Sequence, residues 1–129
     1  MFKNCTSLTA SPMISTDEVG TCGCLEMFYG CSSLSTAQET LSAMTLNESA
    51  YKSMFDRCTS LKNAPNLPAT TLASNCYRSM FYSCSNLESE GIKLPAATLC
   101  TDCYRYMFYG CSKLSCIDVD FTSWGTNNN

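Results

Sequence analysis

Cysteine is the residue type with the most chemical options in this chain, and its spacing decides which of them apply. The chain has 129 residues, of which eleven are Cys and none is His. Without His, the Ser-His-Asp and Cys-His nucleophile systems and His-ligated zinc are excluded. Thiols alone can form disulfides, carry redox chemistry or bind metal. A cysteine share of about 8.5% would suggest a disulfide scaffold in a short secreted chain.

Five of the cysteines hold one repeated position. Each follows a Met-Phe pair by three residues within the pattern M-F-x-x-C-[ST]-x-L, which occurs five times. The pairs start at Met1, Met27, Met54, Met80 and Met107, at intervals of 26, 27, 26 and 27 residues. The cysteines are Cys5, Cys31, Cys58, Cys84 and Cys111. Stacked repeats would align their Cβ vectors instead of facing them, as a disulfide requires. We therefore expect a ladder of buried free thiols that act as small hydrophobes.

The remaining cysteines are less regular. Cys76 and Cys103 are equivalent to each other, and the same position is Gly23 and Ala50 in earlier repeats, which favours packing. The other cysteines include a C-G-C pair, Cys22 and Cys24, a C-x-x-C pair, Cys100 and Cys103, and Cys116. These two pairs would lie about 14 Å apart in a stack of strands, too far to share one ion. We expect no metal and no cofactor. A disulfide at Cys100 or Cys116, or a redox role for Cys22 and Cys24, stays open.

Carboxylates are the other candidates for catalysis. Glycoside hydrolysis needs only two of them across a cleft, and the chain has eleven Asp and Glu. No carboxylate recurs at a structured position of the repeat, and a short stack of coils offers no deep pocket. We therefore assign no catalytic residue and expect a protein that is not an enzyme.

The repeat predicts the fold. From Ile14, or the equivalent Leu41, Leu67 or Leu94, to the next Phe the length is constant, so the extra residue falls between Leu34 and Leu41 and between Leu87 and Leu94. Insertions confined to one place indicate a loop on one face of a stack. Each repeat suggests a short strand after the ladder Leu, a turn at its prolines, and a helix such as 71–81, whose apolar groups fall at i, i+4, i+5, i+8 and i+9.

The predicted fold class is therefore an α/β repeat, a leucine-rich-repeat-like solenoid of about five coils with one short parallel strand and one short helix per coil. The solenoid spans residues 1–116, and residues 117–129 form a C-terminal capping segment or tail, in which Phe121 and Trp124 are large enough to close the last coil. We expect every ladder Met, Phe, Cys and Leu to be buried. We also expect the Ser or Thr after each ladder Cys to bond backbone groups of its own or the next coil.

Charge and hydropathy exclude several partners. The net charge is -3, with Ser and Thr in place of much of the usual charge, so no basic surface is available for nucleic acid. No apolar run approaches the roughly 18 residues of a membrane span, and the N-terminus lacks the apolar region of a signal peptide. Attachment to a membrane is expected only through an anchor outside this chain.

The segments "MFYGCSSL", "APNLPATTLASNCYRSMFYSCSNL" and "KLPAATLCTDCYRYMFYGCSKL" resemble the BspA-like leucine-rich repeats of surface proteins in gut and oral Bacteroidetes. The similarity runs from Met1 to about Leu114. It implies an extracellular or cell-surface module for adhesion, with a host or bacterial surface protein or glycan as partner, and it supplies no catalytic residue. The early repeats depart from the pattern, with Gly23-Cys24 and Ala50-Tyr51 in place of Cys-Tyr. The chain also begins inside a repeat, which suggests a fragment, a processed form or a truncated reading frame.

Recognition residues of a repeat protein lie outside its consensus. The predicted ligand surface has two parts. The first comprises the varied residues after each ladder Leu, namely Thr9, Ser35, Thr36, Lys62, Asn63, Glu88 and Ser89. The second is the row of aromatic residues after the ladder Phe, namely Tyr29, Tyr82 and Tyr109, interrupted by Asp56. Ordinary solvated strand residues and rings that shield a neighbouring coil are the simpler alternatives. A spacer domain of a larger surface protein has no site at all.

The ends of a stack of parallel strands are open edges unless something covers them. Phe2, Leu8 and Ile14 would lie at the N-terminal edge with nothing before them in this chain. We expect self-association through this edge as a homo-oligomer.

Overall fold

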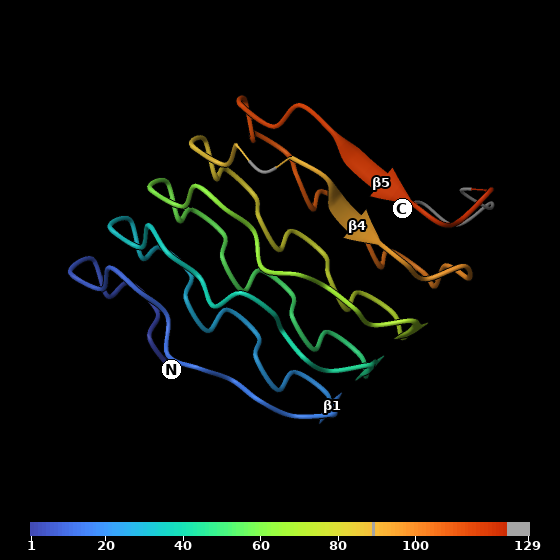
Figure 1. Ribbon diagram of the computed structural model, residues 1–129. Coiled ribbons are helices and arrows are strands. Elements are labelled where there is room, and N and C mark those ends of the chain that lie inside the picture. The colour runs from blue at the N-terminus through green and yellow to red at the C-terminus, as the bar shows by residue number, and fades with distance from the viewer. Residues whose placement is uncertain (89, 124–129) are drawn as a thin grey trace.

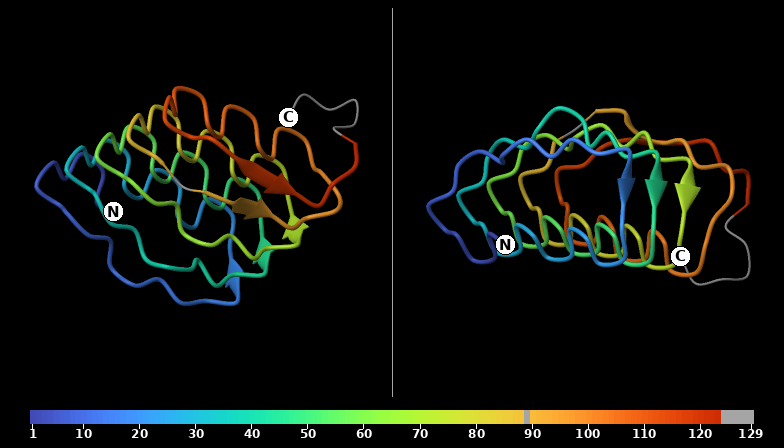
Figure 2. Two further views of the ribbon diagram at one scale, coloured as in Figure 1. Left: turned by 45° about the horizontal axis from the view of Figure 1, so that its top comes forward. Right: turned by 90° about the horizontal axis from the view of Figure 1, so that it is seen from below.

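The computed structural model describes residues 1–88 and 90–123. The chain winds in successive turns that stack on one another, with the N-terminal coil at one end of the stack and the C-terminal coil at the other (Figure 1). The two further views show the same order of coils along the stack (Figure 2). Each coil corresponds to one repeat of the sequence.

Parallel pairing between neighbouring coils holds the stack together. Strands β1 (Glu18–Val19), β2 (Thr45–Leu46) and β3 (Thr71–Leu72) form a sheet in that order. Strands β4 (Ile92–Leu94) and β5 (Ile117–Val119) form a second parallel sheet. Isolated parallel bridges join Ala10 to Thr36, Thr36 to Asn63 and Thr40 to Asn66. The partners are 25 to 27 residues apart, so the sequence repeat sets the register.

The predicted helix in each coil is wrong, because no helix occurs in residues 1–88 and 90–123. The expected helical segments are runs of tight turns in which amides alternate between two kinds of acceptor. The Gly23 amide donates within its own turn to Gly20 at 2.9 Å, and the next amide, that of Cys24, donates to Ala50 of the following coil at 2.9 Å. The fold therefore consists only of strands, bridges and turns, and β3 lies at the start of the predicted helix 71–81.

Left-handed residues explain why no helix forms. Within each run of turns every fourth residue has a positive φ, a conformation that a right-handed helix does not contain. In two neighbouring coils these residues are Ser49, Ser53 and Arg57, then Asn75, Ser79 and Ser83. A period of four also places apolar groups at i, i+4 and i+8. The same apolar pattern therefore fits one face of a helix, which is why the sequence predicts a helix here. Asn4, Gly30 and Gly110 are left-handed as well.

Ladders of identical residues fill the interior. Phe2, Phe28, Phe55, Phe81 and Phe108 stack in order, with ring centroids 5.3 to 5.7 Å apart. A second ladder runs through Tyr51, Tyr77, Tyr104 and Phe121 at 5.7 to 6.0 Å. The expected burial is confirmed in the interior coils, where residues such as Phe55 and Leu61 are fully buried. It is wrong at the first coil, where Met1 is 91% exposed and Cys5 is also exposed. It also fails for the half-buried Met27 and, in the last coil, for the half-buried Phe108, Cys111 and Leu114.

The ladder thiols make the hydrogen bonds to backbone carbonyls that we expected from the neighbouring hydroxyls. Cys58 Sγ donates to the Phe28 carbonyl of the preceding coil at 3.1 Å, and Cys84 Sγ donates to the Phe55 carbonyl at 3.1 Å. Among the five hydroxyls in the described chain only two reach a backbone carbonyl, at 3.5 Å for Thr59 and 3.4 Å for Ser112. The hydroxyl prediction is wrong for the other three, Thr6, Ser32 and Ser85, which are exposed and donate to no backbone carbonyl of the described residues.

The structure describes residues 117–123 of the C-terminal segment. Residues 117–119 form β5 against β4, and the buried Phe121 ring lies 6.0 Å from that of Tyr104. Trp124 lies outside the described residues. The capping role of residues 117–129 stays a prediction. Within the described chain there is no helix long and apolar enough to cross a membrane.

Gly110 tests the left-handed turns. Its φ is +77°, and an added Cβ would lie 3.3 Å from Ser83 Cα. Gly110→Ala should lower the free energy of unfolding by about 1–2 kcal/mol, because a left-handed residue with a Cβ is strained. The matched control is Gly20→Ala, where φ is not positive and an added Cβ meets nothing within 4 Å. Urea denaturation of both variants measures the difference, and an equal effect at the two positions contradicts the turn assignment.

Candidate ligand-binding groove

The predicted recognition residues after the ladder Leu form one exposed row across the coils. Ser35 N donates to the Thr9 carbonyl at 3.0 Å, and Glu88 N donates to the Lys62 carbonyl at 2.9 Å. Thr36 and Asn63 pair as a parallel bridge. All six described members are exposed except the half-buried Ser35, and Ser89 lies outside the described residues. The structure brings these residues together, and their role as a ligand surface stays a prediction.

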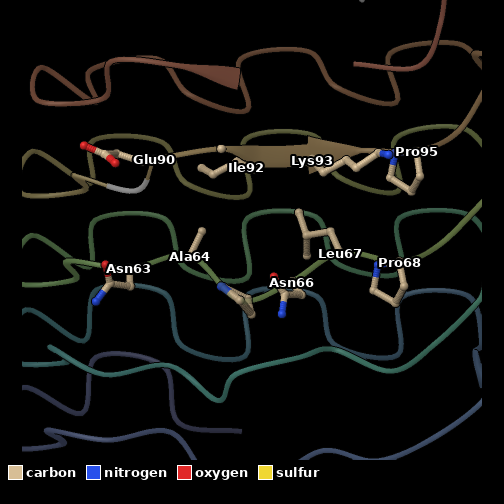
Figure 3. A pocket seen from close by; sticks show the side chains of 11 residues that line it. Asn63, Ala64, Asn66, Leu67, Pro68, Glu90, Ile92, Lys93 and Pro95 are labelled. Carbon is tan, nitrogen blue, oxygen red and sulfur yellow. The ribbon is translucent and has the colours of Figure 1, made fainter. Parts of the chain in front are cut away.

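A groove of about 490 Å³ begins at Asn63 of this row. One wall is the segment 63–68 of the third coil, and the other is the segment 90–95 of the fourth coil, which contains β4. Figure 3 shows the two segments running side by side, with the side chains that line the groove. Pro65 and Pro68 have no amide proton to offer to the neighbouring coil. We call this feature the open groove.

A second groove, of about 530 Å³, lies between segments 10–15 and 36–42 of the first two coils. Its residues stand 53 residues before those of the open groove, which is the sum of one 26-residue and one 27-residue interval. Both grooves therefore lie where a coil with the extra residue, 34–41 or 87–94, meets the coil before it. Between the second and third coils the same region is paired through Thr36–Asn63 and Thr40–Asn66. The inserted residue separates the chain edges locally.

One side chain bridges the two walls of the second groove, which we call the closed groove although it keeps this volume beside the bridge. Gln38 Oε1 accepts a hydrogen bond from Ile14 N at 2.6 Å, and Gln38 Nε2 donates to the Ile14 carbonyl at 2.9 Å and to the Thr40 carbonyl. Ser42 joins the same two coils, since its hydroxyl accepts from Thr16 N at 3.2 Å and donates to Thr16 O at 2.9 Å. Side chains thus replace backbone pairing across the widened gap.

The open groove lacks both of these side chains. Counting 53 residues onward, Gln38 corresponds to Gly91 and Ser42 corresponds to Pro95. The backbone groups bonded by Gln38 correspond to the amide and carbonyl of Leu67 and the carbonyl of Lys93. Within residues 1–88 and 90–123 neither Leu67 group has a hydrogen-bond partner. Asp120 N donates to the Leu94 carbonyl at 3.1 Å, so the carbonyl of Lys93, one residue earlier in β4, faces the opposite edge of the strand and the groove. The open groove therefore has backbone groups along its walls without a partner in the described chain.

Sequence reasoning did not find Leu67, Gly91 or Lys93 as site residues. The signal was present in the alternation of 26- and 27-residue intervals, which defines a two-coil unit and located both insertions. The sequence did not reveal that the insertion separates the backbones of the two neighbouring coils. It also did not reveal that the residue at a single position then decides whether a side chain bridges them.

The predicted row of tyrosines is only partly continuous. Tyr82 and Tyr109 stack with ring centroids 4.9 Å apart, and Tyr106, which the sequence did not suggest, meets Tyr109 edge-on at 6.2 Å. Tyr109 is 60% exposed and Tyr106 is 49% exposed. Tyr29 lies apart from them, with Lys3 Nζ 4.8 Å from its ring centroid.

Asp56, which interrupts the tyrosine row, is a buried acid. Its Oδ1 has no hydrogen-bond partner in the described chain and lies 3.9 Å from Arg57 Nε. Burial raises the pKa of the Asp56 carboxyl to about 6, and the nearby Arg57 charge opposes that rise only in part.

The cysteines are all free thiols. Burial raises the pKa of the Cys58 and Cys76 thiols to about 12, which keeps them protonated and unreactive. Cys22 is exposed whereas Cys24 is buried, so the C-G-C pair does not present two thiols to solvent. Within the described residues no group of three or more Cys, Asp or Glu is placed to hold a metal ion.

Comparisons with known proteins leave the family open. No family model and no curated protein matches the chain. Among solved structures it is similar to a leucine rich cell surface protein from Faecalibacterium prausnitzii A2-165, with 18% identity over 87% of this chain and 32% of that protein, and a TM-score of 0.49. The chain thus spans about a third of that protein's length. A likeness of this degree assigns neither family nor function, so the BspA-like membership stays a prediction.

Asp56 predicts an unusual pH dependence. Because its pKa is raised on folding from 3.8 to about 6, the native state is favoured below pH 4, and this contribution is lost as pH rises through 6. Asp56→Asn should raise the free energy of unfolding by roughly 2 kcal/mol at pH 7 and by almost nothing at pH 4. Urea titrations at both pH values measure this, with the exposed Glu48→Gln as control. An equal gain at both pH values contradicts the electrostatic cause.

Thiol labelling tests the packed interior. Without reductant, Ellman's reagent should label Cys5, Cys22 and Cys116 rapidly in the native protein, because these thiols are exposed. All eleven should react in denaturant. A uniform rate in the native protein contradicts the burial of the ladder, and fewer than eleven thiols in denaturant would reveal disulfides.

Proposed function

We propose that this chain is a non-catalytic binding module that recognises a macromolecular ligand through the open groove and the exposed row beside it. The observation that carries the proposal is the pair of equivalent grooves, of which one is bridged by Gln38 and the other has backbone groups without a partner in the described chain. A ligand that enters the open groove can make the hydrogen bonds that Gln38 makes in the closed groove. The extracellular or cell-surface location expected from the sequence belongs to this proposal.

The composition of the exposed row supports recognition. Lys62 and Asn63 in the third coil are followed in the fourth by Glu88, whose carboxylate accepts a hydrogen bond from Lys113 Nζ at 2.9 Å. The row therefore changes charge from coil to coil, while the interior repeats the same Phe and Cys. Surfaces that vary on a constant framework are typical of repeat proteins that bind partners.

A second candidate function rests on the exposed tyrosines. Tyr82, Tyr109 and Tyr106 form a cluster of stacked and edge-on rings, in which Tyr106 and Tyr109 are exposed to solvent. Exposed aromatic faces are suited to sugar rings as well as to protein partners. Glycan binding by this cluster would not involve the open groove.

Two substitutions separate these functions. Asn66 is an exposed residue of the open groove, and its side chain donates to Thr40 Oγ1 of the second coil at 3.3 Å. Asn66→Trp removes this exposed hydrogen bond and should obstruct the groove without disturbing the core. In a screen against glycans and matrix proteins, Asn66→Trp should weaken binding of the groove ligand by tenfold or more, a loss of about 1.4 kcal/mol. The matched control, Thr70→Trp, is exposed on the same coil and lines neither groove. A ligand lost on Tyr109→Ala but kept by Asn66→Trp favours the glycan function, and the absence of any ligand favours a spacer.

A further inference from the structure

We infer that the open groove binds the primary carboxamide of a glutamine side chain presented by a protein partner, an inference that rests on the proposed binding function. The closed groove supplies the template, because there the chain's own Gln38 occupies the position that is empty at Gly91. The two grooves are built from equivalent segments of the two-coil unit and have similar volumes, about 530 and 490 Å³.

The template shows which bonds a ligand must make. In the closed groove one carboxamide accepts from the Ile14 amide at 2.6 Å and donates to two carbonyls, those of Ile14 and Thr40. The equivalent groups of the open groove are the Leu67 amide and carbonyl, which have no hydrogen-bond partner within the described residues, and the Lys93 carbonyl, which faces the groove. The site therefore requires one acceptor and two donors on a single small group.

That requirement distinguishes between functional groups. A carboxylate offers acceptors only, and a peptide amide or an N-acetyl group offers one donor hydrogen. A primary carboxamide has a carbonyl oxygen and two N–H hydrogens, which matches the three backbone groups. Charge does not oppose such a neutral ligand, since the Lys93 ammonium already lies 3.5 Å from the Asp120 carboxylate.

Ligand entry is also consistent with the geometry. Asn66, Glu90, Gly91 and Lys93 along the groove are exposed. An added Cβ at Gly91 would have only Asp118 Oδ2 within 4 Å, at 3.9 Å. Gly91 has no side chain, so the open groove holds nothing at the position that Gln38 occupies in the closed groove, and its exposed lining leaves room for a side chain from a partner.

The probe is a capped tripeptide, acetyl-Gly-Gln-Gly-N-methylamide, in which the glutamine is the single primary carboxamide. Titrated into ¹⁵N-labelled full-length chain, it should shift the Leu67 amide resonance and saturate at one peptide per protein. The analogues with Leu or Glu in place of Gln should bind at least about tenfold more weakly. Equal shifts with all three peptides, or no shift at Leu67, overturn the inference.

A variant of the closed groove gives an independent readout. Gln38→Ala should lower the melting temperature, because three hydrogen bonds are lost, and should create a second site, seen as a peptide-dependent shift of the Ile14 amide and recovery of the melting temperature. The matched control is Glu39→Ala at the exposed neighbouring residue, which should bind one peptide. A folded Gln38→Ala variant that gains no second site contradicts the inference, and the wild-type titration decides if this variant does not fold.

Failure of the carboxamide inference can be distinguished from failure of the proposed binding function. A macromolecular ligand that Asn66→Trp excludes, but with which the glutamine peptide does not compete, leaves the binding function standing and overturns the carboxamide inference. Peptide binding at Leu67 with no macromolecular ligand in the screen supports the site chemistry and places the natural ligand outside the compounds screened.

Discussion

Hydrogen bonds that run from one coil to the next are the interaction on which the rest of this structure depends. In the runs of turns of the first four coils every second amide donates to the following coil, as Phe28 donates to Met54 and Phe55 to Met80, both at 2.9 Å. The amides between them close tight turns within their own coil. This alternation satisfies the backbone without helix or long strand, and it fixes the separation at which identical side chains meet. The stacked phenylalanines and the thiol-to-carbonyl bonds follow from that separation.

The sequence predicted the repeat and much of the interior, because burial and register depend on spacing along the chain. The ladder Phe and Cys of the interior coils lie where the pattern places them, as Phe55 and Cys58 illustrate. The local conformation was not predicted, since apolar residues four apart fit both a helix and consecutive turns. The deciding feature is the φ of residues such as Ser53 and Arg57, and neither of these types is confined to left-handed backbone.

The sequence predicted one of the two features that create the open groove. The sequence places the extra residue between Leu87 and Leu94, and residues 90–93 of that segment lie in a wall of the open groove. Its effect depends on three-dimensional facts: the segment before it ends in prolines that cannot donate, and the side chain that bridges the equivalent gap is missing at Gly91. A site made of backbone groups leaves little trace in residue types, whereas the exposed tyrosines and charged residues attracted prediction because of their side chains.

The two-coil unit has a consequence for how such proteins diversify. The residue at a single position, Gln38 in one gap and Gly91 in the other, decides whether the chain's own side chain bridges the gap. The packed ladders on either side stay the same. Duplication of the unit multiplies these gaps at intervals of two strand spacings, about 10 Å. A point mutation then opens or shuts each gap by itself. In an array of this kind, the set of accessible grooves that a partner meets can evolve one position at a time, without any change to the framework.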